Sequence, residues 1–184
     1  MLPRVLDAIG LQSGVLVCHS DGASIAALHA GLIRDPRILG ASLIAPHFVI
    51  EDETVRGVAE ARAAYGNGGL RQKLARWHRD VDNAFYGWND AWLDPDFRDW
   101  TISDTLADVR VPLQIVQGDR DAYGTLRQLD IARERCSCRL DLQIMRGIGH
   151  IPQREAPDQT TALVAGFIGT LVEAAGLARP ITSD

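Results

Sequence analysis

Residues 11–31, LQSGVLVCHSDGASIAALHAG, form the stretch that decides the fold of this chain. A short apolar run, Val15–Val17, follows Gly14 and predicts a fully buried strand. The run ends at residues 18–22, CHSDG, and the alanine-rich segment that follows has strong helix propensity. A strand, a sharp turn that carries a serine, and a helix are therefore expected in direct succession.

Such a turn suits a nucleophilic serine. The hydroxyl of Ser20 would be held away from the backbone at the N-terminus of a helix, where developing negative charge is stabilised. Small residues two positions before and after the serine let strand and helix approach closely. Gly22 fills the second position, but Cys18 stands where the G-x-S-x-G pattern has glycine. A serine in an ordinary strand-to-helix turn is the alternative, so the decision depends on an acid and a histidine further along.

The composition excludes several classes of protein. A chain of 184 residues that is 46% hydrophobic is long enough for one domain with a core. Its net charge of −5 argues against nucleic-acid binding. There is neither a membrane-length apolar run nor a basic-then-apolar leader, so we expect a cytoplasmic protein with no membrane partner. Three cysteines, including Cys136-x-Cys138, form neither a disulfide framework nor a zinc pattern, so we expect reduced thiols, no metal and no cofactor.

Along the rest of the chain, strand patterns alternate with helix patterns. Strands are predicted at 38–45, 113–116 and 140–144, and helices at 2–9, 126–135 and 163–172. This alternation predicts an α/β fold with a parallel sheet of about four strands flanked by helices. Sites in such sheets form at the C-terminal ends of the strands.

Residues 48–103 differ from the remainder. They are helical by composition and contain all four tryptophans, Trp77, Trp88, Trp92 and Trp100. Packing within a small helical subdomain explains most of these aromatic residues. The sharper interpretation is a lid that lines an apolar substrate pocket, with Trp88 and Trp92 as substrate-binding residues.

Ser20, Asp121 and His150 each follow a predicted strand, in the chain order Ser, Asp, His. A serine needs a general base to take its proton, and an imidazole titrates in the right range. The imidazole in turn needs a buried carboxylate to fix its tautomer and stabilise its charged form. Asp119 competes with Asp121 for that position.

Four other histidines compete with His150 for the role of base. His19 adjoins the nucleophile and is expected to point away from the base position, and His29 faces away along a helix. His47 follows a strand end and His78 lies in the helical segment. We list His19 and His47 as substrate-binding candidates, while a structural role for His47 is the simpler interpretation.

Three segments together resemble the α/β-hydrolase superfamily. Residues 19–22 (HSDG) resemble the elbow of its esterase-like members, residues 106–121 (LADVRVPLQIVQGDRD) resemble its acid-bearing strand, and residues 149–157 (GHIPQREAP) resemble its histidine loop. The resemblance extends from Val15 to about Leu171. It implies a hydrolase core at 1–47 and 104–177, a helical cap at 48–103 and a flexible tail at 178–184. It favours Asp121 over Asp119 as the acid, makes Ser20 the nucleophile and His150 the base, and makes the backbone N–H of Asp21 an oxyanion donor.

The chain departs from this family at its beginning. A full member has further strands before the elbow, and a loop there that supplies a second oxyanion N–H. Without that loop we expect catalysis to be about 10²–10³ slower, and Val15–Val17 would form an exposed apolar edge. The chain is then a fragment of a longer protein, a protein whose edge is covered by a second copy or a partner chain, or a reduced member with altered activity. Edge-to-edge homodimerisation is our hypothesis.

The resemblance implies a serine hydrolase that acts through an acyl-enzyme on a small or medium ester, thioester or related carbonyl compound. Carbon–carbon bond hydrolysis of dienoic keto acids is a further option. Dehalogenases and epoxide hydrolases carry an Asp where Ser20 stands and fit less well. The rival from another class is a catalytically weak or inactive binding or scaffold module. Arg120 and Tyr123, which flank the acid, are interpreted as structural.

Overall fold

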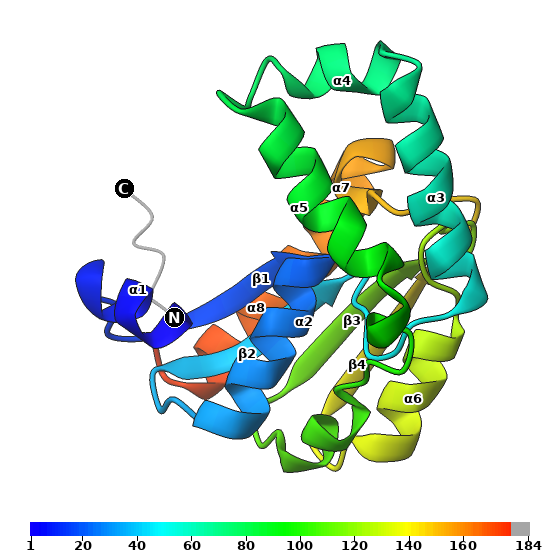
Figure 1. The fold of residues 1–184 in the computed structure, drawn as a ribbon. Helices are drawn as coiled ribbons and strands as arrows, with labels where there is room; N and C mark the ends of the chain where they lie inside the picture. The colour runs from blue at the N-terminus through cyan, green and yellow to red at the C-terminus, as the bar shows by residue number, and fades with distance from the viewer. Residues whose placement is uncertain (178–184) are drawn as a thin grey trace.

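A four-stranded parallel sheet forms the centre of the computed structural model, which describes residues 1–177. The predicted tail, 178–184, lies outside the described residues. Along the sheet the strands follow their order in the chain (Figure 1): β1 (Gly14–His19), β2 (Ile38–Ile44), β3 (Leu113–Gly118) and β4 (Leu140–Met145). The predicted α/β class and parallel sheet of about four strands are therefore confirmed.

Helices cover the sheet on both faces. The helices around it are α1 (Leu2–Ala8), α2 (Asp21–Leu28), α6 (Arg127–Arg135), α7 (Pro152–Glu155) and α8 (Pro157–Ala174), with a π-helical turn η1 (His29–Ile33) after α2 and a 3₁₀ helix η3 (Ser103–Asp108) before β3. The predicted helix at 163–172 is longer than its apolar pattern indicated, because Pro157 supplies a favourable first helical residue.

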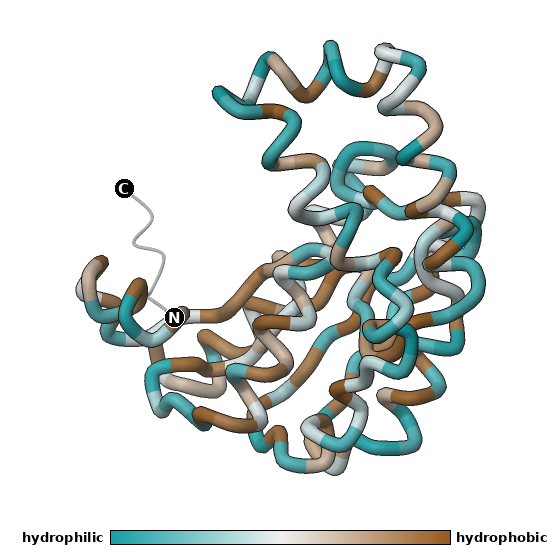
Figure 2. The backbone as a smooth tube through the Cα atoms, in the orientation of Figure 1, coloured by the Kyte–Doolittle hydropathy of each residue, from teal (hydrophilic) through white to brown (hydrophobic). Residues whose placement is uncertain are grey.

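The two faces of the sheet have separate cores, since successive strand residues point to opposite sides. On one face, Leu43 and Ile115 are completely buried beneath α2, η3 and α6. On the other face, Ile44 and Val116 pack against Val164 of α8. Figure 2 shows the hydrophobic residues concentrated along the strands.

Strand β1 lies at an edge of the sheet. It pairs with β2, and no other strand of residues 1–177 pairs with it. Its side chains also divide between the faces: Leu16 packs into the main core, whereas Val17 is 46% exposed. The prediction that Val15–Val17 form a fully buried strand is therefore wrong, whereas the predicted apolar edge is present in the part of the chain that the structure describes.

Between β2 and β3 the chain forms an arch of helices above the strand ends, consisting of α3 (Asp52–Gly66), α4 (Gly69–Leu74), α5 (Val81–Leu93) and the 3₁₀ helix η2 (Pro95–Phe97) (Figure 1). Its two ends leave the core side by side, because Val49 and Thr101 form an antiparallel bridge and the amide of Ile102 donates to the carbonyl of Phe48 at 2.9 Å. This pairing places the arch directly over the carboxyl ends of the strands.

The tryptophans of the arch do not share one environment. Trp92 is buried, Trp88 packs against a small cluster around Phe85, and Trp100 packs against the main core. Trp77, however, is 85% exposed. Interior packing therefore explains three of the four, and Trp77 is the exception because it lies in the turn after α4. Within the described residues, no helix is both long enough and apolar enough to cross a membrane.

Candidate active site

Ser20 lies in the sharp turn between β1 and α2. Its backbone has φ 54° and ψ −124°, a left-handed conformation that costs energy in a residue with a Cβ. Hydrogen bonds hold this conformation: the amide of Ser20 donates to Ile44, and its carbonyl accepts from the amides of Ala23 and Ser24. A Cβ built on Gly22 would lie 3.9 Å from the Cβ of Cys18, an ordinary contact. The turn therefore has room for cysteine in place of the usual glycine.

Three side chains form a hydrogen-bonded chain at the carboxyl ends of the strands. The Ser20 Oγ lies 3.0 Å from Nε2 of His150, and Nδ1 of His150 lies 2.8 Å from Oδ2 of Asp121. The carboxylate accepts a hydrogen bond from the N–H at Nδ1, which leaves Nε2 unprotonated and able to accept a hydrogen bond from the serine hydroxyl. The structure thus brings together the three residues predicted as nucleophile, base and acid.

The Asp121 carboxylate has four donors. Oδ1 accepts from the amides of Tyr123 at 2.7 Å and Gly124 at 3.3 Å, and Oδ2 accepts from Gln117 Nε2 at 2.8 Å and from His150. Burial alone would raise the pKa of this carboxyl, but the hydrogen bonds, led by that from His150, hold the pKa below its ordinary value. The acid is therefore ionised and fixed in orientation.

Asp119, the competing acid, has a structural role. Its Oδ1 accepts from the amide of Gly147 at 2.6 Å, which stabilises the turn after β4. Since Nδ1 of His150 contacts Asp121 and not Asp119, the geometry separates the two aspartates that the sequence left in competition.

The loop that carries His150 is held at both flanks. Glu155 accepts from the amides of Gly149 at 2.7 Å and Ile151 at 3.0 Å, and Nε2 of His19 donates to the His150 carbonyl at 2.7 Å. The loop also passes very close to β3, because a Cβ on Gly118 would lie 2.3 Å from the carbonyl oxygens of Ile148 and Gly149. Glycine at 118 is what allows the histidine loop and the acid-bearing strand to meet.

The remaining histidines have distinct environments. His47 is only 3% exposed, and its ring lies 5.0 Å from Trp92 and 5.7 Å from His150. Burial, with the neighbouring His150, lowers the pKa of His47 to about 4, so its imidazole is neutral. Burial likewise lowers the pKa of His19. His29 is buried near Asp35, at 3.7 Å, and lies outside the site.

A cavity of about 200 Å³ opens over Ser20 and His150. Four predicted residues line it with them, namely Asp21, His47, Trp88 and Trp92. His19 is not among the lining residues, because its Nε2 is directed to the His150 carbonyl. The sequence pattern does not predict the other lining residues, which are Thr54, Val58, Tyr123 and Ile151.

Tyr123 is the most informative of the missed residues. The sequence predicts a structural role for it, but its ring lies 4.7 Å from the His150 ring and forms part of the cavity wall. Its position two residues after Asp121 was the available signal. Arg120, by contrast, is exposed, and its amide donates to the Ile148 carbonyl at 2.9 Å.

The lining of the cavity carries an acidic side chain and no basic Lys or Arg among the described residues. No Lys or Arg in the described part of the chain lines it, and Asp21 contributes a carboxyl whose pKa is raised by burial. Among residues 1–177, no group of three or more His, Cys, Asp or Glu side chains is placed to hold a metal ion. The cavity lining includes the hydroxyl of Ser20, the imidazoles of His47 and His150 and the carboxyl of Asp21.

Comparison with known proteins agrees with this architecture. A family model described as "Alpha/beta hydrolase family" matches residues 2–163. A bacterial membrane phospholipase A is similar in structure, with a TM-score of 0.70 and 23% identity over 92% of this chain and 61% of that one. This chain thus spans less than two thirds of that relative.

Two further solved structures illustrate the range of relatives. A proline iminopeptidase from Mycobacterium smegmatis has a TM-score of 0.67 and 17% identity over 95% of this chain and 71% of that one. A thermophilic esterase from Thermogutta terrifontis has a TM-score of 0.64 and 20% identity over 92% of this chain and 70% of that one. Among curated proteins, no sequence matched this chain. At these identities the structural likeness shows the fold alone.

Proposed function

The chain belongs to the alpha/beta hydrolase family, and on that premise we propose that it is a serine hydrolase that cleaves an ester, a thioester or a related carbonyl compound through an acyl-enzyme. The observation that carries the proposal is the hydrogen-bonded chain from Ser20 through His150 to Asp121. This chain spans only 61% of the phospholipase structure. That this shorter chain has hydrolase activity is therefore part of what we propose.

In the first half of the reaction, the Ser20 Oγ attacks the carbonyl carbon while Nε2 of His150 takes the hydroxyl proton. The carbonyl oxygen becomes an oxyanion. It would face the amide of Asp21, which stands at the start of α2 and has no acceptor among the described residues. When the tetrahedral intermediate collapses, the alcohol or thiol leaves with the proton from His150, and the acyl group remains on Ser20.

In the second half, water attacks the acyl carbon and transfers a proton to Nε2 of His150. The carboxylic acid then leaves and Ser20 regains its hydrogen. Asp121 remains ionised throughout, in keeping with its lowered pKa, and stabilises the imidazolium that forms in each half.

The walls of the cavity restrict the substrate. Trp88, Trp92 and the neutral His47 provide an apolar, uncharged surface. With no Lys or Arg among the described lining residues, and with the carboxyl of Asp21 present, a substrate carboxylate near Ser20 would be unpaired and repelled. This argues against the dienoic keto acids and favours a substrate that is uncharged around its scissile bond.

A fluorophosphonate probe tests the proposal, because it reacts with a serine that a base has activated. We expect one adduct, located at Ser20 by mass spectrometry and absent from Ser20→Ala. Ser13→Ala, which removes an exposed serine, is the matched control and should label normally. If the folded wild-type protein does not react, the hydrolase proposal is wrong and a binding or scaffold role takes its place.

A further inference from the structure

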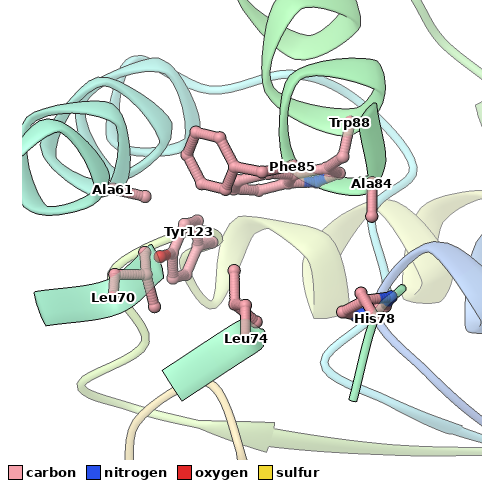
Figure 3. Close-up of a pocket in the computed structure, with 8 residues that line it drawn as sticks. All are labelled: Ala61, Leu70, Leu74, His78, Ala84, Phe85, Trp88 and Tyr123. Carbon is pink, nitrogen blue, oxygen red and sulfur yellow. The ribbon is translucent and has the colours of Figure 1, made fainter. Parts of the chain in front are cut away.

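A second cavity lies within the helical arch, next to the catalytic one. It measures about 280 Å³, is open to solvent, and is lined by Ala61 of α3, Leu70 and Leu74 of α4, and Ala84 and Phe85 of α5 (Figure 3). We call it the arch pocket. Phe85 is buried, so this wall belongs to the small core of the arch.

The arch pocket adjoins the cavity over Ser20. Trp88 and Tyr123 line both spaces, and their ring centroids are 6.5 Å apart in an edge-to-face arrangement. Tyr123 also contacts His150 on the catalytic side, where the ring centroids are 4.7 Å apart. These two aromatic side chains therefore form the boundary between the two spaces, a neck past which a group attached to the reacting carbonyl would have to reach the arch pocket.

The lining of the arch pocket is almost entirely hydrocarbon. No Asp, Glu, Lys or Arg side chain of residues 1–177 lines it, and His78 is its one polar side chain besides the Tyr123 hydroxyl and the Trp88 indole. Charged groups first occur in the adjoining groove beyond Leu70, which carries Glu60 and Lys73. An ionised ligand group would lose its hydration in the arch pocket without gaining a partner.

We propose that the arch pocket binds an uncharged alkyl chain of the substrate, so that the enzyme prefers esters or thioesters of medium chain length. This inference rests on the proposed function, since the chain must be joined to a carbonyl at Ser20. The volume lies near the lower end of the roughly 300–1,000 Å³ typical of small-molecule pockets. It suits a chain of several carbons better than a fused ring system.

Esters of increasing length provide the test. One series varies the acyl chain of p-nitrophenyl esters, and the other varies the alcohol of acetate esters, so that the two sides of the scissile bond are distinguished. Each methylene buried should raise kcat/KM by about fourfold until the arch pocket is filled. The series that shows this rise identifies which part of the substrate enters the pocket.

Ala84→Phe adds a ring at the rim of the arch pocket to obstruct it, and Ala91→Phe makes the same substitution at an exposed position of α5 that does not line the pocket, as the matched control. We expect Ala84→Phe to abolish the rise with chain length and to remain folded by circular dichroism. Ala91→Phe should retain the wild-type profile. Leu74→Ala, which widens the pocket, should shift the optimum to longer chains and serves if Ala84→Phe does not fold.

The outcomes separate this inference from the proposed function. Turnover with no dependence on chain length, or with a dependence that Ala84→Phe leaves intact, refutes the proposal that the arch pocket binds the alkyl chain of the substrate. The pocket would then be only a gap in the packing of the arch. A protein that neither turns over esters nor reacts with the fluorophosphonate refutes the hydrolase proposal instead. In that case 1-octanol is the probe: calorimetric binding to the wild type that Ala84→Phe abolishes supports the pocket, and absence of binding overturns it.

Discussion

Replacement of Asp121 by asparagine tests how the site works, because the surrounding donors determine how an asparagine must sit. The amides of Tyr123 and Gly124 both point at Oδ1, so the asparagine carbonyl oxygen has to occupy that position. The side-chain NH₂ then replaces Oδ2, where it faces two further donors, Gln117 Nε2 and the N–H of His150.

The imidazole relieves this conflict by changing tautomer. With its proton on Nε2, His150 accepts from the asparagine at Nδ1 and can no longer take the Ser20 proton. We expect kcat to fall by about 10⁴, equivalent to about 5 kcal/mol of lost transition-state stabilisation.

The rate of fluorophosphonate labelling measures this loss without knowledge of the substrate, and kcat on a cleaved ester measures it directly. Asp119→Asn is the matched control: its acceptor for the Gly147 amide is retained, so labelling should stay near the wild-type rate. An Asp121→Asn protein that is folded and labels within about tenfold of the wild type would refute the assignment of Asp121 as the orienting acid.

Three further predictions concern the fold around the site. The pKa of His47 is lowered from 6.5 to about 4 in the folded protein. As the pH falls from 7 to 5, only the unfolded chain takes up a proton at His47, so the wild type should lose about 2 kcal/mol of unfolding free energy. His47→Gln should not show this loss. Gly118→Ala places a Cβ 2.3 Å from two carbonyl oxygens of the histidine loop, and should cost about 1–3 kcal/mol and abolish labelling. Wild-type protein should sediment as a dimer at micromolar concentration through the β1 edge, and Val17→Lys as a monomer.

Each of these predictions has a definite contrary result. Denaturant titrations that show the same pH dependence of unfolding free energy for the wild type and His47→Gln would refute the conclusion that His47 is buried as a neutral imidazole. Gly166→Ala is the control for Gly118→Ala, because a Cβ at Gly166 meets nothing within 4 Å. A similar loss of stability and labelling in both variants would refute the explanation that Gly118 is needed for close approach of the histidine loop. A wild-type monomer in sedimentation would reject homodimerisation through β1.

The residues of the hydrogen-bonded chain were accessible to sequence reasoning because a local rule governs their positions. Ser20, Asp121 and His150 each lie in the turn or loop that follows a strand, and the ends of parallel strands meet at one edge of the sheet. The same rule could not choose between Asp119 and Asp121 from the residues alone. That choice depends on which carboxylate receives the amides of the following turn, a property of the folded loop.

The walls of the site follow no such rule, because they depend on how the arch is fixed to the core. Thr54 at the start of α3 donates to the Tyr123 carbonyl at 2.6 Å, and Gly57 lies so close to the Ala122 carbonyl that a Cβ there would be 2.5 Å away. These contacts join segments nearly 70 positions apart in the chain, and they turn Tyr123 from a loop residue into part of the neck. Chemistry in this fold is thus encoded locally at the strand ends. In our proposal, substrate preference is set by long-range contacts, so changes in α3–α5 should alter which ester is cleaved and leave the reaction of Ser20 intact.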